Sequence, residues 1–214
     1  MSKKIFASIL LTLMALTPLS ATSMRELWLA APDSIFPYLD KSKRTELIEL
    51  WDLRQKGSGN ADAAGLNIEL KNSLGGTTTL DTLTTDFVQV KLNKLTVVQM
   101  KLLSEDGDST ICLVKTLMVP EGDSQIDFYD LSWRLKRRVV PDWRNYVARP
   151  DTMSNDDFER VMRSIKLAFV KATLHADDNM VDVDIDVPLR PKEQEDDLSF
   201  ILQRNVKTAI KNVK

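Results

Sequence analysis

Residues 97–118 decide the fold class of this chain. They contain two apolar runs, VVQMKLL (97–103) and STICLVKTLM (109–118), and the polar triplet Asp106-Gly107-Asp108 lies between them. β-Branched and apolar residues with a period near two are typical of strands, and Asp-Gly is a strong hairpin signal. A connection this short forces the two strands to be antiparallel neighbours.

The same pattern extends in both directions from this hairpin. The sequence predicts further strands at 67–70, 87–92 and 125–135, and the Pro120–Asp123 turn precedes the last of them. Five consecutive strands joined by short turns predict an antiparallel β-meander.

Helical patterns flank the meander. Asp40 is expected to cap a helix that runs to about Arg54, with Leu47, Ile48 and Trp51 on its apolar side. The solvent-facing side of this helix is expected to contain Lys41, Lys43, Arg44 and Glu46. Before it, Pro32 and Pro37 exclude one long helix. Residues 24–39 are therefore expected to form an irregular, well-packed segment with at most a short helical turn at 34–38.

A second helix is expected to begin after Ser154, because Ser154 and Asp157 have the spacing of a capping box. Its apolar side begins at Phe158, whereas Asp156 and Arg160 are expected to face water. A hairpin over residues 167–187 follows this helix. Residues 193–214 are expected to form a last helix, although 206–213 can instead pair as a strand.

These elements predict an α+β fold, in which helices pack on one face of an antiparallel β-meander. Residues 24–140 hold the first helix and the meander, and residues 141–214 hold the helix, hairpin and final helix. The second part either completes the same sheet or forms a second lobe. Because a helix precedes antiparallel strands twice, two tandem helix-plus-sheet units are a possible arrangement.

The first 23 residues have the organisation of a secretory signal peptide. Lys3 and Lys4 precede an apolar run at 5–16, which small residues follow at 20–23. The apolar run is shorter than the roughly 20 residues that span a bilayer. We therefore expect an exported, periplasmic or extracellular protein, soluble after cleavage behind Ala21 or Ser23 and without a transmembrane segment in the mature chain.

Composition excludes several classes of function. The chain has 214 residues, of which 43% are hydrophobic, and its 29 basic and 31 acidic residues leave no basic excess for binding nucleic acid. With one His and one Cys it cannot form a Cys/His zinc cluster or an intrachain disulfide. Cys112 is expected to be a buried apolar residue in a strand, and His175 lies in a turn without a nucleophile motif beside it. Neither a cofactor motif nor a catalytic residue is evident, and no cofactor is expected.

Two weak candidate sites remain. The first is an aromatic and basic group for an anionic or sugar ligand, formed by Trp133, Arg137, Arg138, Trp143 and Tyr146. The pattern favours a packed connector over such a surface.

The second candidate is a calcium site at Asp182, Asp184 and Asp186. Alternate residues on a strand lie roughly 6.6–6.8 Å apart, because each residue rises about 3.3–3.4 Å. Three aspartates in such a row favour a charged face over a metal cage.

Several segments resemble a family of exported Bacteroidales proteins that is classed as a domain of unknown function. The resemblance rests on MRELWLAAPDS (24–34), YLDKSKR (38–44), LGG (74–76), LDTLT (80–84) and Asp86. It covers most of the chain after the signal segment and is looser after Pro141. It implies a Gram-negative envelope location and carries no assigned activity, ligand or site residue.

These observations favour a non-enzymatic envelope protein that binds a protein or peptide. The alternative is a hydrolase or carbohydrate-binding protein that uses scattered carboxylates and aromatic residues. A deep cleft with two facing carboxylates would favour the alternative, and an exposed apolar patch over a filled interior would favour the binding module.

The signal segment makes the first testable prediction. N-terminal sequencing of the exported protein is expected to begin at Thr22 or Met24, because the small residues before them suit signal cleavage. Recovery of a cytoplasmic protein that still begins at Met1 would contradict export.

Overall fold

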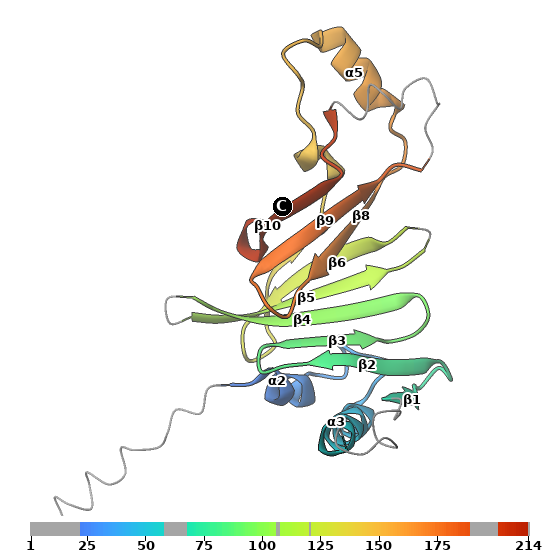
Figure 1. Cartoon of the computed structure of the whole chain (residues 1–214), viewed down its shortest axis with the longest axis vertical. Helices are drawn as coiled ribbons and strands as arrows, with labels where there is room; N and C mark the ends of the chain where they lie inside the picture. The colour runs from blue at the N-terminus through green and yellow to red at the C-terminus, as the bar shows by residue number, and fades with distance from the viewer. Residues whose placement is uncertain (1–21, 58–67, 106–107, 120, 189–200, 214) are drawn as a thin grey trace, which may run out of the picture.

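The computed structural model describes residues 22–57, 68–105, 108–119, 121–188 and 201–213. Within them, seven strands form one sheet in the order β1-β2-β3-β4-β5-β6-β7, and every neighbouring pair is antiparallel. These strands are β1 (Glu69–Lys71), β2 (Thr77–Leu83), β3 (Phe87–Lys91), β4 (Thr96–Glu105), β5 (Asp108–Leu117), β6 (Asp123–Tyr129) and β7 (Leu135–Val139). A second, three-stranded sheet has the order β10-β9-β8, with β8 at Phe169–Leu174, β9 at Met180–Asp186 and β10 at Asn205–Ala209. The predicted α+β fold with an antiparallel meander is confirmed (Figure 1).

The meander has seven strands where the sequence predicted five. β2 was missed because its run TTTLDTL is rich in threonine and weak in apolar residues. β7 was missed because Lys136, Arg137 and Arg138 hide any alternation, and as the last strand of the sheet it keeps most of its side chains exposed. Basic residues are typical of such edge strands, since they oppose pairing with another chain.

Residues 24–30 correct the expectation of an irregular entry segment. They form helix α2 (Met24–Ala30), which ends before Pro32. Ser23 and Glu26 make a full capping box at its start: the Ser23 hydroxyl accepts from the Glu26 N–H at 3.3 Å, and the Glu26 carboxylate accepts from the Ser23 N–H at 2.9 Å. The prolines therefore limit the length of the helix without preventing it.

Helix α3 (Lys41–Lys56) begins after the predicted Asp40 cap. Its Arg44 was expected to face water, and this expectation is wrong because the side chain is 1% exposed. The guanidinium donates to the backbone carbonyls of Trp28 (3.1 Å), Leu39 (2.6 Å) and Ala31 (2.5 Å), and it pairs with Asp33 at 2.9 Å. Five N–H donors in a fixed geometry let one arginine hold both the C-terminal end of α2 and the irregular segment that follows it.

The second half of the chain agrees with the sequence up to β9. Helix α5 (Asn155–Ser164) follows the Ser154 cap, Val161 is buried on its inner side and Phe158 is half-buried. Asp156 and Arg160 are exposed, as predicted. The predicted final helix is wrong for the end of the chain: residue 201 is helical, but β10 occupies 205–209 and a short helical turn follows it, so the strand alternative is correct for the first part of 206–213. Residues 193–200 lie outside the described residues.

Two apolar cores lie on the two faces of the meander. α2, α3 and residues 31–39 cover one face, where Trp28, Phe36 and Met100 are fully buried. The three-stranded sheet covers part of the other face, and its Val170 and Val183 share a core with Val114 of the meander. The short helical turns η1 (Trp143–Tyr146) and η3 (Ile210–Asn212) also belong to this second side. Division of the chain near residue 140 stays a prediction.

Polar side chains of the meander hold the outer strand of the small sheet. β8 pairs with β9 along one edge only. Along its other edge, the N–H groups of Val170, Ala172 and Leu174 donate to side chains of Asp123 (3.2 Å), Ser124 (2.9 Å) and Gln99 (2.9 Å), respectively. Gln99 also donates to the Leu174 carbonyl at 3.0 Å, and Lys101 donates to the Ala176 carbonyl at 2.7 Å.

This edge lies close to the meander and is buried. Gln99 is 5% exposed and Lys101 is 1% exposed, and the Lys101 ammonium also pairs with Asp86 at 2.9 Å. A Cβ at Gly122 would lie 3.0 Å from Lys171 of β8, and Gly122 has φ +100°, so glycine suits this approach on both counts. Three buried side chains (Gln99, Lys101 and Ser124) and the exposed Asp123 thus replace the neighbouring strand that β8 lacks.

Replacement of Gln99 tests this arrangement. Gln99→Leu is expected to lower the free energy of unfolding by about 2–4 kcal/mol, because it strands a buried N–H and a buried C=O, each worth about 1–3 kcal/mol. Denaturant melts measure the change. Gln203→Leu, at an exposed position, is the matched control and is expected to stay within about 0.5 kcal/mol of the parent. Equal stability of the two variants would contradict a role for Gln99 at the β8 edge.

Candidate functional site

The structure separates the aromatic candidates of the sequence. Trp133 lies in the helix-side core, with its ring centroid 5.5 Å from Tyr129 and 6.4 Å from Phe36. Trp143 lies in the core on the other face of the meander, where the half-buried Tyr146 packs at its margin. Because both tryptophans are 8% exposed and lie on opposite faces, they do not form one ligand-binding surface.

The two candidate arginines also point to opposite faces. Arg138 binds the Asp127 carboxylate through Nε (2.7 Å) and Nη2 (3.0 Å) on the helix side. Burial opposes ionisation of Asp127, but the hydrogen bonds from Arg138 and its neighbours outweigh it and lower the pKa of this carboxyl. Arg138 is thus already used in a structural ion pair.

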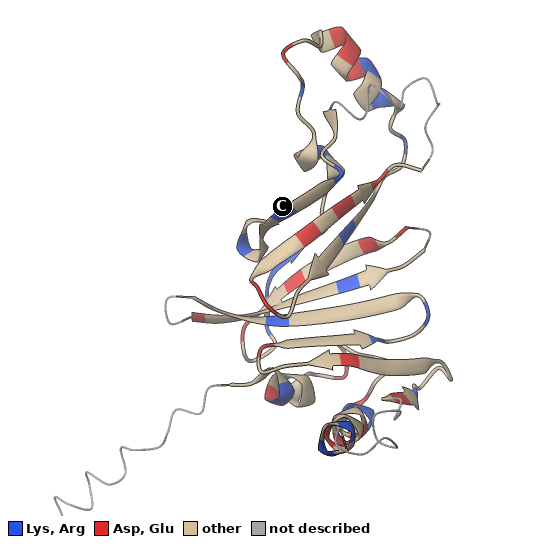
Figure 2. Cartoon of the chain, viewed as in Figure 1, with Lys and Arg blue, Asp and Glu red and all other residues tan. Residues whose placement is uncertain are grey.

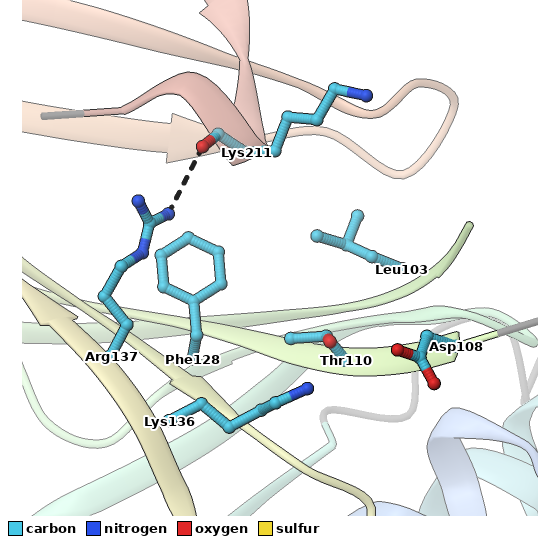
Figure 3. A pocket seen from close by; sticks show the side chains of 7 residues that line it. All are labelled: Leu103, Asp108, Thr110, Phe128, Lys136, Arg137 and Lys211. Atoms are coloured by element: carbon cyan, nitrogen blue, oxygen red, sulfur yellow. Dashed lines mark hydrogen bonds between the residues drawn. The ribbon is translucent and has the colours of Figure 1, made fainter. Parts of the chain in front are cut away.

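Arg137 belongs instead to a pocket on the other face (Figure 3). Its guanidinium lies 4.1 Å from the ring centroid of Phe128 and donates to the Lys211 carbonyl at 3.4 Å. The cavity has a volume of about 480 Å³. Its lining residues are Leu103, Asp108, Thr110, Phe128, Lys136, Arg137 and Lys211.

The aspartate row lies on the partly exposed side of β9, and Figure 2 shows its acidic residues there. Asp182 is 2.7 Å from His175, and Asp184 pairs with Lys171 at 3.3 Å. Across the described residues, no group of three or more His, Cys, Asp or Glu side chains converges as a metal ion would require. Asp182 and Asp184 are therefore paired with basic side chains of β8 and the turn that follows it.

One end of the meander is apolar, a feature that the sequence did not predict. The β1–β2, β3–β4 and β5–β6 connections lie side by side there, on the right of the sheet in Figure 1. We call the exposed apolar side chains at this end the turn surface. Its members are Tyr38 (38% exposed), Leu74 (72%), Leu95 (49%), Leu117 (50%), Met118 (40%), Val119 (47%) and Val140 (63%).

Backbone and amide hydrogen bonds connect these turns. The Met118 N–H donates to the Leu95 carbonyl at 2.7 Å, and the Ser73 N–H donates to the Tyr38 carbonyl at 3.1 Å. The buried Asn72 amide donates to the Leu92 carbonyl at 2.8 Å and accepts from the Leu74 N–H at 3.0 Å. The turns that carry the exposed side chains are therefore held to one another by hydrogen bonds.

A groove of about 410 Å³ lies within the turn surface. Pro37, Tyr38, Leu117 and Val140 form its apolar part, and Lys115 and Gln125 are among its polar lining. A sequence signal for this site did exist: large apolar residues such as Leu74, Leu95 and Val119 stand in segments that turn chemistry places at the surface.

The fold and these sites define an α+β protein without a recognisable catalytic centre in its described residues. A family model described as "Protein of unknown function (DUF3256)" matches residues 16–208, and the chain belongs to this family. The family resemblance noted in the sequence is confirmed to this extent.

A solved structure shares the fold. It is a domain of an uncharacterised protein from Porphyromonas gingivalis W83, with a TM-score of 0.65 and 22% sequence identity. The match covers 87% of this chain and 94% of that one. No curated protein matches the chain.

Burial of the Cys112 thiol, beside the pocket, leads to a prediction about its reactivity. Cys112 is the register partner of Phe128 and is fully buried, as predicted, and burial raises the pKa of its thiol to about 12. At pH 8 the thiol is therefore protonated and shielded, and a thiol reagent is expected to label it only after denaturation. Stoichiometric labelling of the native protein within minutes would contradict this burial.

Proposed function

We propose that this protein is an exported, non-enzymatic module that binds a protein or peptide through the turn surface. The observation that carries the proposal is the gathering of seven exposed apolar side chains at one end of the sheet. Contiguous exposed apolar patches on soluble domains commonly mark interaction sites. Scattered single residues would need no such explanation.

The geometry of the groove supports insertion of an apolar side chain from the partner. Pro37 and Tyr38 approach from the segment before α3, and Leu117 and Val140 approach from the ends of two strands. A side chain that enters here removes apolar surface from water on several sides at once. Lys115 and Gln125 can then hydrogen-bond to the partner's backbone or polar groups.

Rigidity of the turns supports the same proposal. Asn72 fixes the β1–β2 connection with Gly75 at φ +75°, and the Met118–Leu95 hydrogen bond joins the next two connections. A surface already held in its binding form loses less conformational freedom on association.

The hydrolase or carbohydrate-binding alternative has less support. Paired-carboxylate catalysis needs two acidic groups that face one another across a cleft. Among the described residues that line the pocket in Figure 3, Asp108 is the one carboxylate. Trp133 and Trp143, which this alternative would use for stacking on sugars, are core residues.

The capping box of α2 supports one of the two cleavage positions. Cleavage after Ser23 would remove the cap, whereas cleavage after Ala21 leaves both Ser23 and Glu26 in place. We therefore propose Thr22 as the mature N-terminus. Among the described helices, none has the length and apolar character to cross a membrane.

Charge substitutions in the turn surface test the proposal. Leu95→Asp with Val119→Asp is expected to weaken binding of an envelope partner at least about tenfold, because a charge in an apolar contact loses its hydration. Photo-crosslinking from Leu95 in intact cells identifies the partner, and titration with the purified partner gives the affinity.

The control is Leu53→Asp, at a 56% exposed position on α3 away from these turns. It is expected to bind like the parent protein. A partner that binds the parent, the double variant and the control with equal affinity would contradict the turn surface as the binding site.

A further inference from the structure

The pocket in Figure 3 lies at the other end of the meander from the turn surface. Leu103 and Thr110 are register partners near the β4–β5 connection, and Phe128 and Arg137 are register partners on β6 and β7. η3 supplies Lys211 from above this part of the sheet. The proposed protein-binding function does not use any of these side chains.

The cationic side of the pocket is arranged around Arg137. The exposed guanidinium contacts the face of Phe128 and the Lys211 carbonyl, at 4.1 Å from the ring centroid and 3.4 Å from the oxygen. A guanidinium has five N–H donors, and the carbonyl takes one of them. Within the described part of the chain, neither Arg137 nor Lys136 has a carboxylate partner.

Away from Arg137, the described lining combines apolar side chains with Thr110 and Lys136, and Asp108 is its acidic residue. Phe128 and Leu103 provide hydrocarbon surface, and Asp108 stands across the cavity from Arg137 in Figure 3. The volume of about 480 Å³ falls within the range of roughly 300–1,000 Å³ that is usual for small-ligand pockets. Asp108 disfavours a second negative charge at its end of the cavity.

We propose that this pocket binds a carboxylate carried by an apolar group, independently of the turn surface. The carboxylate occupies the fork of the Arg137 guanidinium, and the apolar group lies against Phe128 and Leu103. Arginine matches a carboxylate with two parallel hydrogen bonds, which gives this pairing its geometric specificity. The carboxylate belongs either to a small organic acid or to the C-terminus of a peptide.

Two acid and amide pairs test the chemistry by calorimetric titration. One pair is 4-phenylbutanoate with 4-phenylbutanamide, and the other is the peptide Gly-Ser-Gly-Leu with a free or an amidated C-terminus. Each amide keeps the shape of its acid and removes the charge. At least one acid is expected to bind about tenfold or more tightly than its amide, the usual value of a charge-assisted hydrogen bond to arginine.

Substitutions test whether Arg137 is responsible for the preference for the acid over the amide. Arg137→Gln is expected to abolish the difference between acid and amide, and Arg137→Lys to keep only part of it. Arg134→Gln is the control, because the Arg134 side chain is 82% exposed and pairs with Asp130 outside the pocket.

Preference for the acid in the peptide pair alone identifies a C-terminus as the source, and preference in the phenylbutanoate pair alone identifies a small acid. Equal binding of acid and amide, no binding of any probe, or an acid preference that survives Arg137→Gln would overturn the proposal.

Discussion

The unpaired edge of β8 is the constraint on which the arrangement of the two sheets depends. A buried strand edge leaves backbone N–H and C=O groups without partners, and each such group costs free energy. Here Gln99, Lys101, Asp123 and Ser124 supply these partners from the face of the meander. The small sheet therefore docks in one position on the large one, because a shift along β8 would break these hydrogen bonds together.

This docking also explains polar residues that a core would otherwise exclude. Gln99 and Lys101 alternate with the apolar Val98 and Met100 along β4 and point to the face that meets β8. The apolar members point to the helices. One strand thus serves a purely apolar interface on one side and a hydrogen-bonded interface on the other.

The meander itself determines where the two candidate sites lie. In an up-and-down sheet, alternate connections fall at the same end, so the β1–β2, β3–β4 and β5–β6 connections bring Leu74, Leu95 and Val119 together. The opposite end opens between the sheet and η3, where Arg137 and Lys211 face a shared cavity. The turn surface and the proposed carboxylate pocket are therefore separate regions of the molecule.

Local patterns in the sequence determined most of the secondary structure. Caps at Asp40 and Ser154, the turn at 106–108 and the alternation over 181–187 were enough to predict α3, α5, the central hairpin and β9. Such signals act within a few residues and need no distant contacts. The inner strand β2 and the edge strand β7 were missed, because both have weak alternation and form by pairing with stronger neighbours.

Only the tertiary structure determined where the candidate sites lie and which residues depart from their sequence predictions. Arg44 looked like a surface residue on its helix, but the folding of residues 31–39 over it made it a buried partner for three carbonyls. Arg137 and Arg138 are adjacent in sequence, yet the pleat places one in a pocket and the other in an ion pair with Asp127. The physical reason is that burial and partnership depend on which segments meet in space, and the residues that meet at β8, the turn surface and the pocket come from distant parts of the chain.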